Sequence, residues 1–155
     1  MALMNFITMI SIALACGMGI ALQSGMSGQL GRLLGNPMFA TLVVFVVSAT
    51  IMATVVLTTG VKLPSMMTLR AIPVYLWGAG SLLSAAALTG VYWLMPQMGV
   101  PGVMVGVLCG QLLISLLAGH YGWFDMPVVV VTPQKLVGAG LLVLGILLIN
   151  VEVPG

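Results

Sequence analysis

The chain has 155 residues, of which 61% are hydrophobic and 4% are charged, and its formal net charge is +2. Soluble domains carry about 25% charged residues, so this chain has too few to cover a water-facing surface and is predicted to be an integral membrane protein in contact with the lipid bilayer. Its four Lys and Arg residues are scattered, which excludes a basic nucleic-acid-binding surface.

Five apolar stretches are long enough, or nearly so, to cross the hydrocarbon core, which takes about 20 helical residues. In chain order they lie at 5–24, 37–59, 73–95, 102–118 and 134–150. All five are expected to be helices, because an open sheet leaves backbone groups unsatisfied in lipid. The sequence therefore predicts an all-α integral membrane protein with a single transmembrane domain over 1–155. A cleaved signal peptide is the alternative for the first stretch, but no basic residue precedes it.

The segments between the spans are predicted to be loops and turns. Residues 25–36 are polar and glycine-rich, and residues 59–73 form a loop with two basic side chains. Residues 96–102 predict a tight turn, because each of the two prolines breaks a helix. The valine run at 128–131 is interpreted as an extended or interfacial segment, since an isolated strand is hard to satisfy at a membrane.

Candidate catalytic and metal-binding residues are scarce. Cys16 and Cys109 lie inside apolar runs and are expected to be buried hydrophobes, not a disulfide. His120 is the sole histidine, so no metal site and no cofactor are expected. Asp125 and Glu152 lie in interfacial or terminal segments, which offers no cleft for acid–base catalysis and disfavours an enzyme.

The basic residues predict the orientation of the chain. With five spans, Lys62, Arg70 and Lys135 share one side of the membrane with the N-terminus, and Arg32 lies on the other. The positive-inside rule then places the N-terminus in the cytoplasm. One or two added charges could reverse this bias, so the chain is close to the point at which both orientations occur.

Small residues mark two candidate faces for helix packing. Gly102, Gly106 and Gly110 recur every four residues in the fourth span, and Gly17 lies within a similar stripe in the first. This spacing lets helix backbones approach closely, within one chain or between subunits. The alternative is that glycine is simply common in membrane helices.

Polar side chains recur on two of the spans. Gln23 is followed four residues later by Ser27, and Gln111 is followed in the same way by Ser115. Helical spacing places each pair on one face. These residues either line a neutral polar cavity for a small-molecule substrate or join helices by hydrogen bonds. Trp77 is either part of the interfacial aromatic belt or a wall of that cavity.

His120 has two interpretations, an interfacial residue at the end of the fourth span or a proton-linked gate. No Asp or Glu falls within the five spans. An intramembrane carboxylate is the usual proton relay and the usual counter-ion for a cation. Carboxylate-based proton/cation antiport is therefore not expected, and a transported molecule should be neutral or zwitterionic.

Four stretches, taken together and in order, resemble one known family. They are "GIALQSGMSGQLGRLLGNPMFATLVVF" at 19–45, "PQMGV" at 96–100, "GQLLISLL" at 110–117 with "HYG" soon after, and "LVGAGLLVLGILLI" at 136–149. On these residues the chain is similar to the YdcZ-type family of the drug/metabolite transporter superfamily, over nearly its whole length. The family's recurring positions correspond here to Gln23, Gly31, Arg32, Gly35, Pro37, Phe45, Pro96, Gly99, Gly110, Gln111, Gly122 and Gly145.

The resemblance implies a multi-pass protein of the bacterial inner membrane whose five helices form half of an antiparallel ten-helix transporter. Its partner would be a second copy or a paralogue. Departures from the family pattern are Ser27 in place of an asparagine and Gly119 in place of an acidic residue. In the third span, Ser81 and Ser84 partly replace a pair of small residues. The expected function is a secondary transporter or facilitator. The alternative is a structural or accessory membrane subunit in which the glutamines only join helices.

Overall fold

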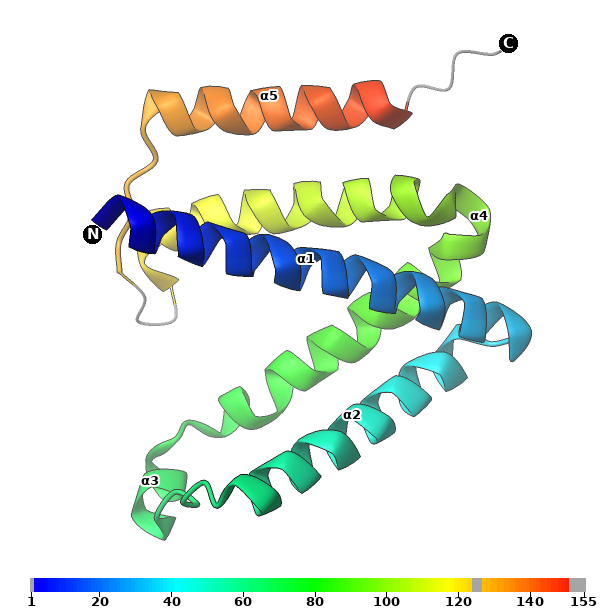
Figure 1. Cartoon of the computed structure of the whole chain (residues 1–155), viewed down its shortest axis with the longest axis vertical. Coiled ribbons are helices and arrows are strands. Elements are labelled where there is room, and N and C mark those ends of the chain that lie inside the picture. Colours follow the sequence, from blue (N-terminus) through cyan, green and yellow to red (C-terminus); the bar gives the residue numbers. More distant parts are fainter. Residues whose placement is uncertain (1, 124–126, 151–155) are drawn as a thin grey trace. The chain divides into compact units, whose positions relative to one another are not determined.

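A computed structural model describes residues 2–123 and 127–150, and these residues contain helices and no strand (Figure 1). The helices are α1 (Ala2–Leu33), α2 (Pro37–Thr59), α3 (Met66–Ala71), α4 (Val74–Tyr121) and α5 (Pro133–Asn150). This confirms the predicted all-helical class. Within the described residues, α1, α2 and α4 are long and apolar enough to cross a membrane, and α5 is apolar but shorter.

Helix α1 is longer than the sequence predicted. The first span was expected to end at Ser24, with a loop over 25–36, but the helix continues to Leu33. Glycines at 25, 28 and 31 make this stretch look like a loop, since glycine in a helix interior costs about 1 kcal/mol relative to alanine. Side chains of α2 and α4 pack against Gly28 and Gly31, and this packing outweighs the low propensity.

The turn from α1 to α2 is fixed by a cap on each helix. Gly35 has a φ of 67°, and the amide N–H of Asn36 donates to the carbonyl of Gly31 at 3.1 Å, as in a Schellman motif. The side-chain oxygen of Asn36 then accepts from the N–H of Met38 at 2.8 Å, and Pro37 occupies the first position of α2. Helix α2 has the bounds expected of the second span.

Helix α4 is interrupted at Gly99, whose φ of 72° and ψ of 165° are not helical. The sequence predicted a turn over the whole of 96–102. Instead the helix runs through Pro96, and a single glycine takes the conformation that other residues rarely adopt. Pro101 is then placed in the first turn of the second half, where its missing N–H is tolerated. We call residues 74–98 α4a and residues 100–121 α4b.

The connecting segments agree in outline with the sequence. Residues 59–73 include the short helix α3, capped by the Ser65 hydroxyl, which accepts from the N–H of Thr68 at 3.2 Å. The valine run at 128–131 belongs to no helix and no strand of the described chain. Asp125 and Glu152 lie outside the described residues.

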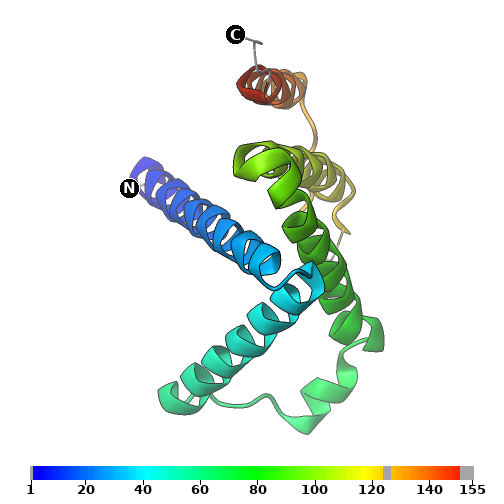
Figure 2. The same ribbon diagram turned by 90° about the vertical axis from the view of Figure 1, so that its right-hand side faces the viewer.

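The contacts divide the chain into two compact units, Met1–Gln97 and Met98–Gly155, which we call unit 1 and unit 2. In unit 1, α1, α2 and α4a approach one another beside the α1–α2 turn (Figures 1 and 2). Most large apolar side chains of the described chain remain exposed, including Ile20, Val47 and Leu83. Because water would disfavour such a surface, lipid or a partner must cover it.

Candidate functional site

Gln23 is joined to a second helix by its side-chain amide. Its Nε2 donates to the Ser27 hydroxyl at 3.2 Å and to the Tyr92 hydroxyl of α4a at 3.0 Å. The first bond exists because α1 remains helical beyond Ser24, which places Gln23 and Ser27 on one face. We call Gln23, Ser27 and Tyr92 the Gln23 cluster.

Tyr92 is the member of this cluster that the sequence analysis missed as a site residue. It is 1% exposed, the most buried large side chain of the described residues. A buried tyrosine needs a partner for its hydroxyl, and a glutamine elsewhere in the membrane segments is the available partner. The pairing itself depends on tertiary structure and leaves no local signal.

A second polar contact joins α2 to α4a in the same region. The Thr89 hydroxyl donates to the Thr41 hydroxyl at 3.0 Å, and Thr41 in turn donates to the carbonyl of Pro37 at 3.1 Å. Ser24, Ser27 and Thr41 are all buried. The three helices of unit 1 therefore meet through neutral hydroxyl and amide groups. Each interhelical bond of this kind contributes about 0.6 kcal/mol on average and 1–2 kcal/mol in model peptides.

Two glycines allow this close approach. A Cβ atom at Gly28 would lie 2.8 Å from the Cβ and Cγ of Met95, and one at Gly31 would lie 3.4 Å from the Cα of Pro37. These positions carry the tight packing of unit 1. The sequence analysis singled out Gly17 in the same helix, where a Cβ would meet nothing within 4 Å.

The Gln23 cluster leaves hydrogen-bonding capacity open. Both hydrogens of the Gln23 Nε2 are used, and the residue remains exposed in the single chain. Its carbonyl oxygen Oε1 is therefore the atom that can accept a hydrogen bond from a ligand. Two hydroxyl groups fix the amide, so Oε1 is held in place without any charge.

Gln111 and Ser115 have different surroundings in α4b of unit 2. Gln111 is exposed and makes no side-chain hydrogen bond with the described residues. Ser115 donates to the carbonyl of Leu112 in its own helix at 2.9 Å. The pair thus shares a helix face, as the spacing predicted, but the two side chains do not bond to each other.

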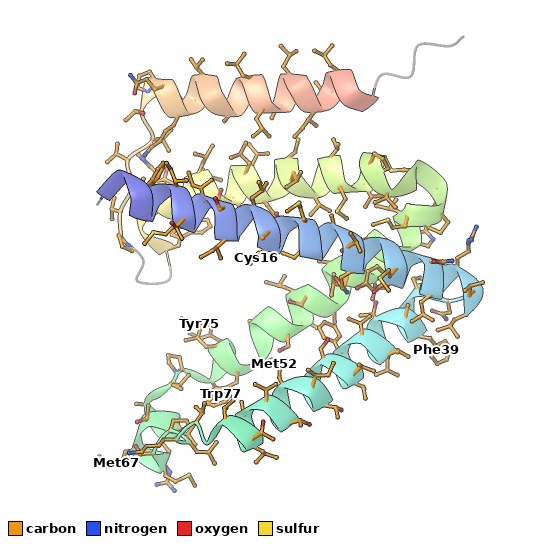
Figure 3. The ribbon with its side chains drawn as sticks, viewed as in Figure 1. Cys16, Phe39, Met52, Met67, Tyr75 and Trp77 are labelled. Atoms are coloured by element: carbon orange, nitrogen blue, oxygen red, sulfur yellow. The ribbon has the colours of Figure 1, made fainter. Side chains whose placement is uncertain are left out.

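The remaining predicted site residues do not belong to the Gln23 cluster. Trp77 is exposed near the start of α4a, about 22 Å along the helix from Tyr92 (Figure 3). A Cβ at Gly106 or Gly110 would meet nothing within 4 Å, and Gly102 is partly buried. Packing through these glycines stays a prediction, which requires a partner to cover them.

A small pocket lies beside the Gln23 cluster in unit 1. It has a volume of about 230 Å³ and is lined by residues of the α1–α2 turn and of α4a, among them Arg32, Gly35, Pro37, Tyr92 and Trp93. Arg32 is exposed in the last turn of α1. Its guanidinium has no hydrogen bond or ion pair with the part of the chain that the structure describes.

His120 lies in a separate region, inside unit 2. Its Nδ1 accepts from the N–H of Val131 at 3.4 Å, and the N–H of Val129 donates to the carbonyl of Gly119 at 2.8 Å. An apolar cavity of about 280 Å³ adjoins His120 and Tyr121. His120 therefore holds the segment after α4b, which leaves both of its predicted roles open. No group of three metal-ligating side chains occurs in residues 2–123 and 127–150.

Comparison with known families gives one match. A family model described as "Putative inner membrane exporter, YdcZ" matches residues 8–148 of the chain. This range contains the Gln23 cluster, Arg32 and both halves of α4. No curated protein and no solved structure matches the chain.

Proposed function

Because the chain belongs to the YdcZ family, whose description is that of an inner membrane exporter and not of an enzyme, we propose that it moves small neutral or zwitterionic organic molecules across the bacterial inner membrane. The protein would act as a secondary transporter or facilitator. Gln23, Ser27, Gln111 and Ser115 would contact the substrate, with Trp77 as a further wall of the path.

One observation carries this proposal. The Gln23 amide is held by the Ser27 and Tyr92 hydroxyls while the residue itself stays exposed. A rigid, uncharged acceptor suits the N–H or O–H groups of a polar solute. Neutral hydrogen bonds are individually modest, about 0.5–1.5 kcal/mol net, so a solute held by several can still be released.

The distribution of charge supports the same substrate class. The two acidic residues of the chain are Asp125 and Glu152, so unit 1 contains no carboxylate. An organic cation would lose its hydration without gaining a negative partner there, which is costly. Proton coupling through an intramembrane carboxylate, the usual relay, has no residue to use in α1, α2 or α4.

The proposed assembly is an antiparallel dimer of five-span chains. Helix α4 has 48 residues, which as one unbroken helix would span about 72 Å, against a hydrocarbon thickness of about 30 Å. The break at Gly99 divides it into two lengths that each suffice for one crossing. A second copy in the opposite orientation would supply the inverted repeat that transporters commonly place around a midplane site.

A second candidate function is a structural or accessory membrane subunit. It is favoured by the same bonds of Gln23, since a glutamine that joins α1 to α4a is a means of interhelical adhesion. The two functions differ in what a substitution of Gln23 should do, because adhesion affects stability alone.

Transport by the purified protein in proteoliposomes tests the proposal. Uptake would be measured for radiolabelled glycine, serine, glycine betaine and glycerol, with tetraethylammonium as the cationic comparison. We expect uptake of at least one neutral or zwitterionic compound, little change between pH 7 and 9, and no accumulation of tetraethylammonium under a pH gradient. Gradient-driven accumulation of tetraethylammonium would show the proposed substrate class to be wrong.

The orientation of the chain can be tested separately. Leu63 is 80% exposed in the loop before α3, so Leu63→Cys in a chain with Cys16→Ala and Cys109→Ala gives a single reporter. A membrane-impermeant maleimide, applied to right-side-out and to inside-out vesicles, should label a part of the protein in each. Labelling from one side alone would contradict an antiparallel homodimer.

A further inference from the structure

Arg32 carries a charge that unit 1 cannot neutralise. Residues 1–97 contain no Asp or Glu, and the guanidinium makes no contact with a carboxylate or carbonyl of the described residues. The two acidic side chains of the sequence, Asp125 and Glu152, lie outside unit 1 and outside the described residues. An anionic group of a lipid or a solute can therefore neutralise Arg32 without displacing a partner within unit 1.

The pocket beside Arg32 fits one end of an amphiphile. Its volume of about 230 Å³ is below the range of about 300–1,000 Å³ that is usual for drug-sized ligands, so a headgroup-sized ligand fits better. Trp93 and Tyr92 form an aromatic wall, and Pro37, the first residue of α2, brings the positive end of that helix dipole to the same pocket.

Exposed apolar side chains follow Arg32 in the sequence, next to the polar part of the pocket. Leu33, Met38 and Phe39 follow Arg32 across the α1–α2 turn, and all three are exposed (Figure 3 labels Phe39). A ligand whose anionic group meets Arg32 can thus extend an acyl chain over these side chains. Tryptophan and arginine at the end of a membrane helix are typical of the depth at which lipid headgroups lie.

We propose that the Arg32 pocket binds a phosphate group, with the phosphate of an anionic phospholipid as the source that the surrounding apolar surface favours. The planar guanidinium can donate two parallel hydrogen bonds to phosphate oxygens, which an ammonium group cannot do. Basic pockets between membrane helices commonly hold lipid headgroups in this way. This site binds through the charge of Arg32, whereas the Gln23 cluster offers neutral groups, although Tyr92 belongs to both.

The test is a titration of the full-length protein in a neutral detergent, followed by its thermal unfolding midpoint. The ligands are short-chain phosphatidylglycerol, short-chain phosphatidylcholine and inorganic phosphate. The variants are Arg32→Gln, Arg32→Lys and, as a matched control, Arg70→Gln. Arg70 also lies in the last turn of a helix and is exposed, but it does not line the pocket.

We expect phosphatidylglycerol to raise the midpoint of the wild type and of Arg70→Gln at the same concentrations, and phosphatidylcholine to have a smaller effect. Arg32→Gln should weaken the apparent affinity on the order of tenfold, with Arg32→Lys between the two. An Arg32-dependent response to inorganic phosphate would support the phosphate site with a free solute as its source. The proposal would be overturned if Arg32→Gln showed the same apparent affinity for phosphatidylglycerol as Arg70→Gln. If Arg32→Gln does not fold, the same comparison is made between Arg32→Lys and Arg70→Gln.

Discussion

The two glutamines that precede a serine by four residues have the same spacing but opposite surroundings. In unit 1, Gln23 bonds to Ser27 and to the buried Tyr92 of another helix. In unit 2, the Gln111 side chain makes no hydrogen bond with a described residue, and the Ser115 hydroxyl donates to the backbone carbonyl of Leu112 in the same helix. A tyrosine on a helix that packs closely makes the difference. The spacing of a polar pair therefore gives its helix face, and the neighbouring helix determines what the pair does.

A polar side chain in a membrane helix can be satisfied within its own chain or left for another molecule to satisfy, and the two glutamines differ in this respect. Gln23 is partnered within the chain, so its substitution should affect folding as well as any ligand. Gln111 is left open, and in lipid an unpartnered amide is costly. A substrate, water or a second chain must satisfy it. The five substitutions below test this contrast, in order of decreasing effect on the stability of the chain.

The largest loss of stability is expected for Gly28→Leu. Even a Cβ atom there would come within 2.8 Å of the Met95 side chain, and overpacking of this kind costs about 1–3 kcal/mol. Thermal unfolding in detergent should show a clearly lower midpoint. Gly17→Leu is the matched control on the same helix, with nothing within 4 Å of its Cβ. Equal midpoints for the two variants would mean that α1 and α4a do not pack through Gly28.

Gln23→Leu should lower both stability and transport. The change removes two hydrogen bonds and leaves the hydroxyl of buried Tyr92 without its partner, which costs about 1–3 kcal/mol. Gln29→Leu is the control, because Gln29 is exposed on the same helix outside the Gln23 cluster. Unfolding and proteoliposome uptake would be measured on each variant. A loss of uptake that only follows the lost fold would favour the adhesive function.

Tyr92→Phe should have a smaller effect of the same sign. It removes the hydroxyl that accepts from Gln23 and keeps the ring, so the expected cost is about 0.6–1.7 kcal/mol. Tyr75→Phe is the control, because Tyr75 is exposed at the start of α4a. An unchanged midpoint for Tyr92→Phe would show that the Gln23–Tyr92 bond contributes nothing measurable to folding.

Gln111→Leu should leave the unfolding midpoint of the chain unchanged and should still impair uptake. No described residue loses a partner, so the effect would come from the substrate path alone. Gln23→Leu and Gln111→Leu should therefore differ in their unfolding midpoints while both lower uptake. If uptake is unchanged in both glutamine variants, neither residue lines the transport path.

Gly106→Leu gives the smallest effect within the chain and a distinct effect on assembly. A Cβ there meets nothing within 4 Å, so folding should be unaffected, while a close contact with a second copy would be lost. Cross-linking in lipid would measure the dimer fraction. Leu108→Met on the same helix is the control, and equal dimer fractions would place this face in lipid.

The sequence predicts the fold well where local chemistry decides it. The composition indicates a membrane protein, and the apolar stretch predicted at 37–59 has the observed bounds of α2. The prediction was wrong over most of 25–36, where glycine content indicated a loop but α1 continues to Leu33. Between the third and fourth spans a break is present as predicted, but it is confined to Gly99 and does not extend over 96–102. Low local propensity was outweighed by contacts that the sequence alone does not display.

The candidate site was predictable in part. Gln23 and Ser27 could be identified because a polar pair at helical spacing stands out in an apolar chain. Tyr92 and the packing glycines Gly28 and Gly31 could not, because their role arises between helices far apart in sequence. The role of Trp77 stays a prediction, since an aromatic residue near a helix end carries no information about which helix it will face.

The interruption at Gly99 also bears on how the chain is made. During synthesis, hydrophobic segments are passed to the bilayer one after another, and the count of crossings decides on which side each later residue ends. An unbroken α4 would be inserted into the bilayer as one segment. The residues after Tyr121, including Lys135, would then lie on the opposite side of the membrane. In the proposed five-span arrangement, Gly99 thus separates two crossings, and this one residue would decide on which side of the membrane the residues after Tyr121, about a fifth of the chain, lie.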